Sequence, residues 1–567
     1  MTKRNVGGLL SLILALALIL TGCGKIPTSG PVGQSDSGTA GRDVSAYNFN
    51  PDPPAEGASA EEIVRGFLTA GTGPAEDYRV AREYLTTDLA TEWNPVEQTF
   101  VFKGEPSITP SAEEGEFNIQ LELDSLVDAN GIMTKVPEES TRALSFKVDE
   151  VEGEQRIVDA PDGTMIHINQ FPVLFSSQKL YFFDPTYEYL VPDVRWFVNR
   201  TGIAAAVVGA LLNGPAPYLS SAVTSAFPDG TELSRSSIPV EAGVAAVDFD
   251  PALFENTSAQ TRQRMQQQLL ASLNQLTSIQ DVVLMSDQRE VGLGRDGTSE
   301  QLAEQDPTVG STQIAINNKS LVYFEGREPV PIAGMPNVRH TNPRYPAMDV
   351  RGTVFAFLNR ERTQLYTINE NRSLAAAVTG QELTWPTIDN SGWVWTVSNA
   401  ASTPLISAVP VHEVDGVTRN VNASWLADRN VLSFKISADG ARAAIVASDE
   451  DGNNLYIAGV IRDSEGVPRG LTNPTTLQTE GDVNFVNWAS ETKVVAADVG
   501  GAERVTAEIV GLDGKNEALR PLLGMTNLST GPGEDSVYAE TDETVYLRVG
   551  SSWRAQETEV SDLNYPG

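Results

Sequence analysis

The feature that most restricts how this chain can fold is a repeat in its C-terminal half. A Pro-x-x-Asp-x-x-Gly-x-Val pattern spans Pro346 to Val354 and recurs 40 residues later, from Pro386 to Val394. A looser copy covers Phe434 to Gly440, and two more units end in the apolar runs Lys493 to Ala496 and Ser536 to Ala539. Units of about 40 to 50 residues built from short strands and Asp/Gly turns are typical of propeller blades. Residues 310–560 are therefore predicted to form an all-β propeller of five to seven blades.

The ends of this repeat array predict how the ring closes. Five units are visible, and the strands expected near Ile314 to Phe324 and Thr544 to Val549 would together complete a sixth blade. Closure by a terminal strand removes exposed sheet edges, which would otherwise promote aggregation.

The N-terminus has the pattern of a secretory signal. Lys3 and Arg4 precede an apolar run from Val6 to Leu20, and residues 1–22 are predicted to be the signal peptide. The run ends in Leu-Thr-Gly-Cys, which resembles a bacterial lipobox and contains Cys23, the only cysteine. The resemblance implies cleavage between Gly22 and Cys23, with an S-diacylglycerol and an N-acyl group on that cysteine. An ordinary signal followed by a free cysteine is the alternative.

Residues 23–57 are rich in Gly, Ser, Thr, Pro and Asp and are predicted to be a flexible tether. Two acyl chains on Cys23 would hold the protein on the extracytoplasmic face of the cell membrane. The chain has 40 basic and 75 acidic residues, a formal charge of −35. Removal of the signal, which has two basic and no acidic residues, makes the charge −37. Because this negative charge would be repelled by phosphate backbones, nucleic acid is excluded as a partner. A single cysteine also excludes a disulfide framework.

Residues 58–176 are predicted to form an α+β domain. Ser59 to Glu62 is a capping-box pattern that leads into helical spacing, and a second helical stretch carries Val80 to Leu85. Beyond Pro95 the apolar period changes to two, in strands that contain Phe100, Phe117 to Leu123, Leu144 to Val148 and Met165 to Ile168. This order of elements is similar to that of NTF2-like folds.

Residues 177–297 are predicted to form a second α+β domain. Its expected elements are two strands at Tyr181 to Asp184 and Tyr189 to Pro192, a helix from Trp196 to Leu212, a strand at Val244 to Phe249, a helix with Met265 to Leu276 on one face, and a strand at Val282 to Met285. The order resembles the GerM (GerMN) domain, in its Tyr-Phe, Leu-Val-Pro and Arg opening, the helix end Leu211 to Pro215, the turn Phe227 to Thr231 and the Gln-rich helix that follows.

No arrangement of residues predicts catalysis, a metal or a cofactor, and the chain is predicted not to be an enzyme. The imidazoles are His167, His340 and His412, and no catalytic or phosphate-binding motif includes them. His167 is expected to be a structural residue of a strand. The repeated Asp349, Asp389 and Asp439 stand just before glycines, which favours turn formation over a carboxylate cluster.

Two further patterns have a structural and a functional interpretation. Asp449 to Asn453 alternates oxygen ligands like a calcium loop, but Asn454 and Val460 stand where a calcium loop needs Gly and Glu, so a hairpin turn is favoured. The propeller tryptophans are expected to pack between blades rather than to stack on sugars; they are Trp385, Trp393, Trp395, Trp425 and Trp488.

Lipobox, tether, α+β domain, GerM-like domain and propeller follow one another in the order of the LpqB family of actinobacterial lipoproteins, which the whole chain resembles. The resemblance implies an association with the MtrAB two-component system, in which the protein binds the extracytoplasmic domain of a sensor histidine kinase and serves envelope homeostasis. The alternative is a glycan- or peptidoglycan-binding or processing protein of the envelope.

Overall fold

The computed structural model describes residues 51–137, 139–294, 302–326, 328–411, 416–500 and 504–567, which all belong to one compact unit, residues 45–567. The predicted signal peptide, Cys23 and the tether as far as residue 50 lie outside the described residues, as does His412. In the part of the chain that is described, no helix is long and apolar enough to cross a membrane.

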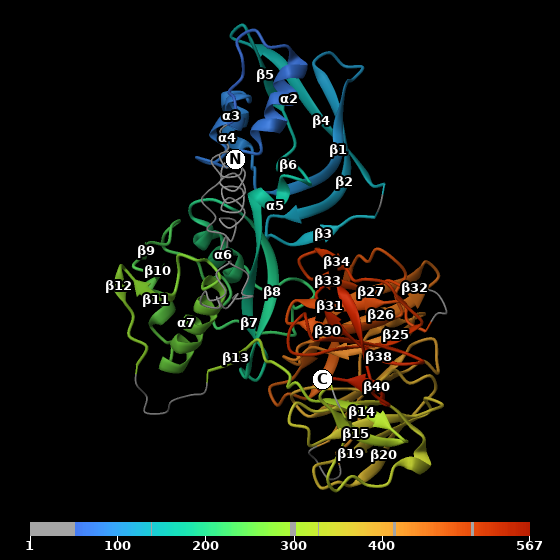
Figure 1. Cartoon of the computed structure of the whole chain (residues 1–567). Helices are drawn as coiled ribbons and strands as arrows, with labels where there is room; N and C mark the ends of the chain where they lie inside the picture. The colour runs from blue at the N-terminus through green and yellow to red at the C-terminus, as the bar shows by residue number, and fades with distance from the viewer. Residues whose placement is uncertain (1–50, 138, 295–301, 327, 412–415, 501–503) are drawn as a thin grey trace, which may run out of the picture. The chain divides into compact units, whose positions relative to one another are not determined.

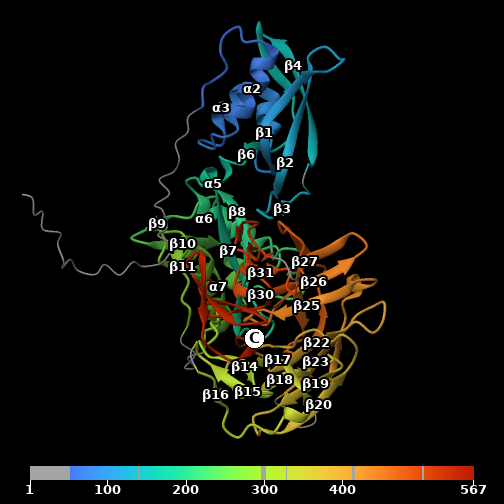
Figure 2. The ribbon, with the colours of Figure 1, turned by 45° about the vertical axis from the view of Figure 1, so that its right-hand side comes forward.

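The first domain packs short helices on one face of a mixed sheet (Figures 1 and 2). The helices are α2 (Ala60–Ala70), α3 (Arg79–Glu83) and α4 (Thr87–Glu92). The sheet has the order β5-β4-β2-β1-β6, with β3 paired to β2. Its strands are β1 (Gln98–Pro110), β2 (Glu116–Asp128), β3 (Met133–Lys135), β4 (Thr141–Val151), β5 (Glu154–Asp159) and β6 (Thr164–His167). Only β6 runs parallel to its neighbour in this sheet, as the partner of β1.

Local sequence explains these elements. The Ser59 hydroxyl accepts from the Glu62 backbone N–H, and the Glu62 carboxylate accepts from the Ser59 N–H at 2.8 Å, which confirms the capping box. Phe67 of α2 packs edge-on against Phe146 of β4, with ring centroids 5.9 Å apart. From Phe117 to Leu123 of β2, buried apolar residues alternate with exposed polar residues, as a strand with one covered face requires. The helix-then-sheet order is confirmed.

The second domain has two small sheets. Helix α5 (Phe171–Leu174) leads into the hairpin of β7 (Phe175–Phe183) and β8 (Tyr189–Val198), whose sheet order is β13-β8-β7. The other sheet has the order β12-β11-β10-β9, in which α7 connects the parallel strands β10 and β11. Its remaining elements are α6 (Ile203–Leu212), β9 (Val240–Glu241), β10 (Val244–Phe249), α7 (Ala259–Leu273), β11 (Asp281–Ser286), β12 (Arg289–Glu290) and β13 (Glu304–Gln305). Because β13 pairs with β8, this domain extends past the predicted boundary at residue 297.

The predicted helix from Trp196 is wrong at its start. Trp196 continues β8, where it pairs with Ser177 of β7, and α6 begins only at Ile203. The run from Val194 to Val198 is β-branched and aromatic, which favours a strand. Gly202, with φ of +89°, then turns the chain into the helix.

The C-terminal half forms six sheets of four main strands each within the described residues. The first two are β16 (Val330–Pro331), β15 (Ser320–Phe324), β14 (Gln313–Asn317) and β40 (Ser561–Asn564), then β17 (Pro343–Met348), β18 (Phe355–Asn359), β19 (Gln364–Ile368) and β20 (Leu374–Thr379). The third and fourth are β21 (Thr387–Ile388), β22 (Trp393–Ser398), β23 (Leu405–Pro410) and β24 (Arg419–Val421), then β25 (Asn430–Ile436), β26 (Arg442–Asp449), β27 (Gly452–Arg462) and β28 (Pro468–Leu471), with β29 (Thr475–Leu477) also on β27. The last two are β30 (Phe485–Ser490), β31 (Lys493–Ala497), β33 (Glu508–Gly511) and β34 (Asn516–Ala518), then β36 (Met525–Thr530), β37 (Val537–Thr541), β38 (Val545–Val549) and β39 (Ser552–Gln556). Strands β32 (Arg504–Val505) and β35 (Leu522–Leu523) form a separate pair.

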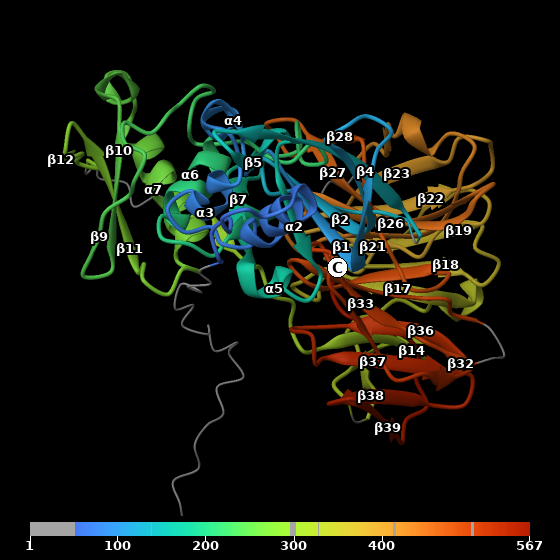
Figure 3. The ribbon, with the colours of Figure 1, turned by 90° about the horizontal axis from the view of Figure 1, so that it is seen from above.

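These six sheets are the blades of a closed propeller. The innermost strands contact one another in a ring, in the order β40, β17, β21, β25, β30, β36 and back to β40. The C-terminal strand β40 pairs with β14, and Figure 3 shows β36 to β39 beside β14. The strand predicted to close the ring, Thr544 to Val549, is instead β38 inside the sixth blade. The closing strand therefore lies beyond the predicted boundary at residue 560, because pairing across the whole ring has no local sequence signal.

Candidate functional site

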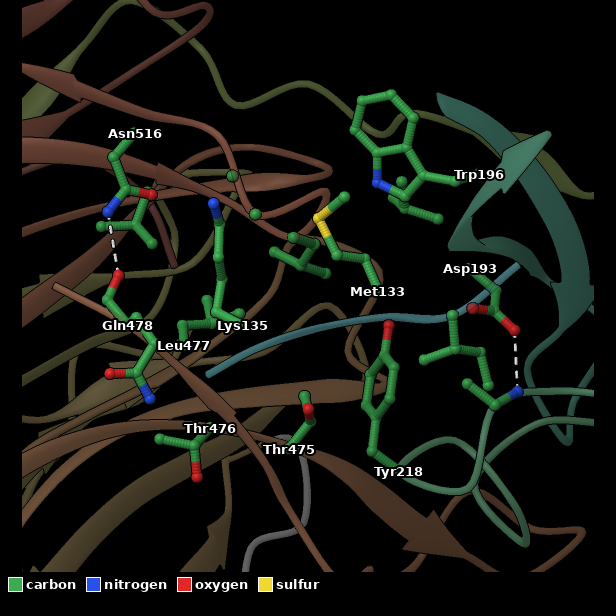
Figure 4. Close-up of a pocket in the computed structure, with 17 residues that line it drawn as sticks. Met133, Lys135, Asp193, Trp196, Tyr218, Thr475, Thr476, Leu477, Gln478 and Asn516 are labelled. Atoms are coloured by element: carbon green, nitrogen blue, oxygen red, sulfur yellow. Dashed lines mark hydrogen bonds between the residues drawn. The ribbon is translucent and has the colours of Figure 1, made fainter. Parts of the chain in front are cut away.

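The three folded domains meet at a pocket of about 70 Å³ (Figure 4). The first domain contributes Met133 and Lys135 of β3, the second contributes residues of β8 with Tyr218, and the propeller contributes Thr475 to Gln478 and residues near Asn516. These segments are distant in the sequence, so only the tertiary structure creates this site. A pocket of this size has room for a few water molecules and not for a typical small-molecule ligand.

Trp196 joins all three domains at this pocket. Its backbone N–H donates to Gly131 O of the first domain at 2.7 Å, and its indole N–H donates to Asp513 O of the propeller at 3.0 Å. The Lys515 ammonium lies 4.6 Å from the centroid of the indole ring, a cation–π contact. The strand position that the helix prediction missed is therefore what places this side chain at the junction.

Asp193 and Arg195, two residues apart on β8, form a buried ion pair beside the pocket. Asp193 Oδ1 accepts from Arg195 Nε at 3.0 Å and Oδ2 accepts from Nη2 at 2.6 Å, a two-point contact. Arg195 Nη1 also donates to Asn130 O of the first domain at 2.9 Å. Burial opposes the charged form of Arg195, but the Asp193 carboxylate outweighs this effect and raises the guanidinium pKa. The pair thus ties β8 to the first domain while neutralising its own charges.

The segment around Tyr218 attaches the second domain to the fourth blade. Tyr218 O accepts from the Gly459 backbone N–H at 2.9 Å and from the Thr472 hydroxyl at 2.5 Å. A Cβ added at Gly459 would lie 2.5 Å from the Ala222 Cβ, so the two backbones approach more closely than a side chain permits. Burial raises the pKa of the Tyr218 phenol well above its ordinary value.

Arg442 and Glu491 extend this network into the propeller. Arg442 is fully buried, pairs with Asp439, and donates from Nη1 to Glu491 O at 2.6 Å. The Glu491 carboxylate accepts from the Tyr181 hydroxyl at 3.0 Å and pairs with Lys179 of β7. Charged groups on both sides of the boundary between the second domain and the propeller are therefore engaged with each other.

The repeated aspartates form turns, as expected. Asp349 Oδ1 accepts from the Thr353 N–H at 2.6 Å, and Asp389 Oδ1 accepts from the Trp393 N–H at 2.9 Å. In the described residues, no group of three or more His, Cys, Asp or Glu side chains is arranged to hold a metal ion. The favoured hairpin interpretation of the calcium-like pattern is confirmed, because Asp449 pairs with Gly452 where β26 turns into β27.

The structure also places the two described histidines and the predicted propeller tryptophans. His167 ends β6 and packs edge-on against Phe102 with centroids 5.4 Å apart, whereas His340 is exposed in a short 3-10 helix. Trp395 is fully buried between the third and fourth blades, 6.1 Å from the Phe434 centroid. The other predicted tryptophans belong to or pack against these blade clusters; they are Trp385, Trp393, Trp425 and Trp488.

Sequence reasoning did not identify the buried cations Arg195, Lys435, Arg442 and Arg462. A weak signal was present, because each stands in or beside an otherwise apolar strand where a solvent-exposed charge is unexpected. Arg195 and Arg442 pair with aspartates two and three residues away, whereas the partner of Arg462, Asp389, comes from a different blade and could not be inferred from near neighbours.

Comparison with known proteins agrees with this architecture. Residues 319–566 match the family model described as "Lipoprotein LpqB beta-propeller domain", residues 53–172 match "Lipoprotein LpqB, N-terminal domain", and residues 179–292 match "Sporulation and spore germination". The NTF2-like label for the first domain stays a prediction. A solved structure with tandem GerMN domains of the sporulation protein GerM from Bacillus subtilis is 19% identical, over 28% of this chain and 60% of that chain, with a TM-score of 0.17.

Two relatives match over most of their length. The "Lipoprotein LpqB" of Cutibacterium acnes is 25% identical over 85% of this chain and 85% of its own. The "Lipoprotein LpqB" of Streptomyces avermitilis is 26% identical over 97% of each chain. Since the two LpqB family models together cover well over half of the sequence and the relatives span nearly all of it, the chain belongs to the LpqB family of lipoproteins.

Proposed function

We propose that this protein is a lipid-anchored, non-catalytic component of the cell envelope that binds the extracytoplasmic domain of a sensor histidine kinase and modulates its two-component signalling. Membership of a lipoprotein family supports the anchor, and the lipobox-like motif supports Cys23 as the lipidated residue. The anchor would hold the folded domains at the extracytoplasmic face of the membrane, although the negative charge of these domains is repelled by anionic lipid.

The observation that carries this proposal is that polar side chains at the junction bind residues of the neighbouring domains. Arg195 donates to Asn130 O of the first domain, and Glu491 of the propeller pairs with Lys179 of the second domain. These contacts support three domains held as one preformed body. A body of this kind offers broad surfaces in a fixed arrangement, and such surfaces suit protein recognition with little ordering cost.

Crosslinking of the full-length protein in intact membranes tests the partner. We expect crosslinks to the extracytoplasmic domain of a sensor kinase, and their loss in a Cys23→Ser variant that is released from the membrane. If the protein and the kinase are present at equal levels and the protein forms no crosslink to any envelope protein, the proposal is contradicted. Retention of Cys23→Ser on the membrane in the absence of detergent would contradict the anchor separately.

Glycan binding is the second candidate, and one cavity favours it. A cavity of about 370 Å³ opens at one end of the propeller and is lined by Trp488, Tyr565, Asp306 and Glu491, a mixture of aromatic and carboxylate groups found in sugar sites. Burial and then the neighbouring Glu491 raise the pKa of Asp306. Titration with soluble peptidoglycan fragments, monitored by Trp fluorescence and compared with a Trp488→Leu variant, distinguishes this candidate from protein recognition.

A further inference from the structure

The ammonium of Lys435 is buried inside the propeller without a counter-ion. Lys435 lies on β25 and is only 4% exposed. Its Nζ donates to Pro386 O at 3.4 Å, a long and neutral contact. No carboxylate in the described part of the chain lies within ion-pair distance of this Nζ. A buried charge without a partner lowers the stability of the folded state, so the groups around Lys435 indicate what could compensate it.

Lys435 borders a small cavity on the propeller axis. The walls of the cavity come from the innermost strands or the residues next to them, and every blade contributes at least one residue. The lining residues include Tyr345, Trp385, Lys435, Phe485, Asn527 and Asp562. The cavity measures about 10 Å³, which is room for a single particle of the size of a water molecule. The position is therefore central to the fold and enclosed by all six blades.

The other charged groups around this cavity are already neutralised. Asp562, the carboxylate that lines it, receives two hydrogen bonds from the Arg344 guanidinium, one of them at 2.9 Å from Nη2. Glu540, packed behind Asp562, is occupied by backbone N–H groups of the closing strand. Burial lowers the pKa of Lys435 to about 8, which leaves the ammonium form predominant at neutral pH. Lys435 is thus the uncompensated charge of this cavity.

We propose that the axial cavity binds one monoatomic, monovalent anion such as chloride, held by the Lys435 ammonium. The charge of the ligand follows from the unpaired cation, and its size follows from the volume, which is too small for phosphate or sulfate. The axial cavity lies next to the larger cavity at the end of the propeller, because Asn564 lines both. Binding would complete the core at the point where the six blades converge.

Bromide, which scatters anomalously, is the direct probe. Crystals of the wild-type mature chain grown in sodium bromide should show an anomalous peak in the axial cavity, in contact with Lys435 Nζ. A water molecule at this position with no bromide peak would overturn the proposal. This arm uses the unaltered protein and does not depend on the stability of any variant.

Thermal unfolding in sodium chloride or bromide, compared with sodium gluconate at equal ionic strength, is the second test. Halide should raise the Tm of the wild-type protein in a saturable manner, as mass action requires for a single site. The rise should disappear in Lys435→Met and in the more polar Lys435→Gln, and it should persist in Lys147→Met, which removes an exposed lysine of the first domain. A halide-dependent rise that survives in either Lys435 variant would overturn the proposal.

Discussion

The Glu540 carboxylate accepts a hydrogen bond from the backbone N–H of Asp562 at 2.7 Å, and this contact joins the last blade to the strand that closes the ring. The same carboxylate accepts from the Leu563 N–H and, at 2.7 Å, from the Asn527 side-chain amide. Glu540 is buried, and burial together with the Asp562 charge raises its pKa to about 7 from an ordinary value of 4.5. A titratable group is therefore among the contacts that hold the closing strand.

The raised pKa of Glu540 predicts a falling stability between about pH 4.5 and pH 7. The folded state binds this proton more tightly than the unfolded state, so the contribution is fully present below the unfolded pKa and is lost as pH rises through the folded pKa. The effect is at most on the order of 3 kcal/mol. Thermal unfolding from pH 5 to pH 8 should show a slope that Glu540→Gln flattens. The exposed Glu543→Gln should leave the slope unchanged, and an equal slope in both variants would contradict the assignment.

Replacement of Arg195 by Met should be strongly destabilising. It leaves the Asp193 carboxylate buried without its partner and removes the bond to Asn130 O. Losing one member of a buried pair costs about 3–5 kcal/mol. Denaturant unfolding followed by Trp fluorescence measures the loss, with the exposed Arg235→Met as the control. If the double variant Asp193→Leu/Arg195→Met were no more stable than the single variant, the unpaired charge would not be the cause.

Replacement of Gly459 by Ala should separate the second domain from the fourth blade. The new methyl group would meet the Ala222 Cβ at 2.5 Å and Tyr218 O at 2.8 Å, and both are held by packed backbone. Overpacking of this kind costs about 1–3 kcal/mol. Limited proteolysis should cut near residues 214–224 faster than in the wild type. Gly481→Ala, where the added carbon has no atom within 4 Å, should not change the rate.

Replacement of Trp196 by Phe should loosen the junction locally. The ring remains, but the donor to Asp513 O is lost, at a cost of about 0.5–1.5 kcal/mol. Hydrogen exchange should quicken at residues 129–135 and 511–516. Trp553→Phe loses a comparable bond, to Arg520 O at 2.6 Å within the propeller, and should leave the junction segments unaffected. Equal exchange at the junction in both variants would contradict a role of Trp196 in joining the domains.

Patterns that depend on near neighbours could be predicted from the sequence. The Ser59–Glu62 capping box, the alternation in β2 and the Asp389 turn all rest on hydrogen bonds or periodicity within a few residues. The helix expected from Trp196 was wrong because the apolar residues before Ile203 were taken as part of the helix that follows them. The β-branched and aromatic residues of this run instead favoured continued pairing with β7.

The sequence by itself determined the order of domains, the blade repeat and the lipobox-like motif, because each is a local pattern that neighbouring residues carry. Only the tertiary structure decided that Ser561 to Asn564 closes the ring, that Trp196 joins three domains, and that Lys435 faces an axial cavity. These features arise from segments far apart in the chain. A side chain acquires its charge state and its partners from burial against such segments, and burial is a property of the folded molecule.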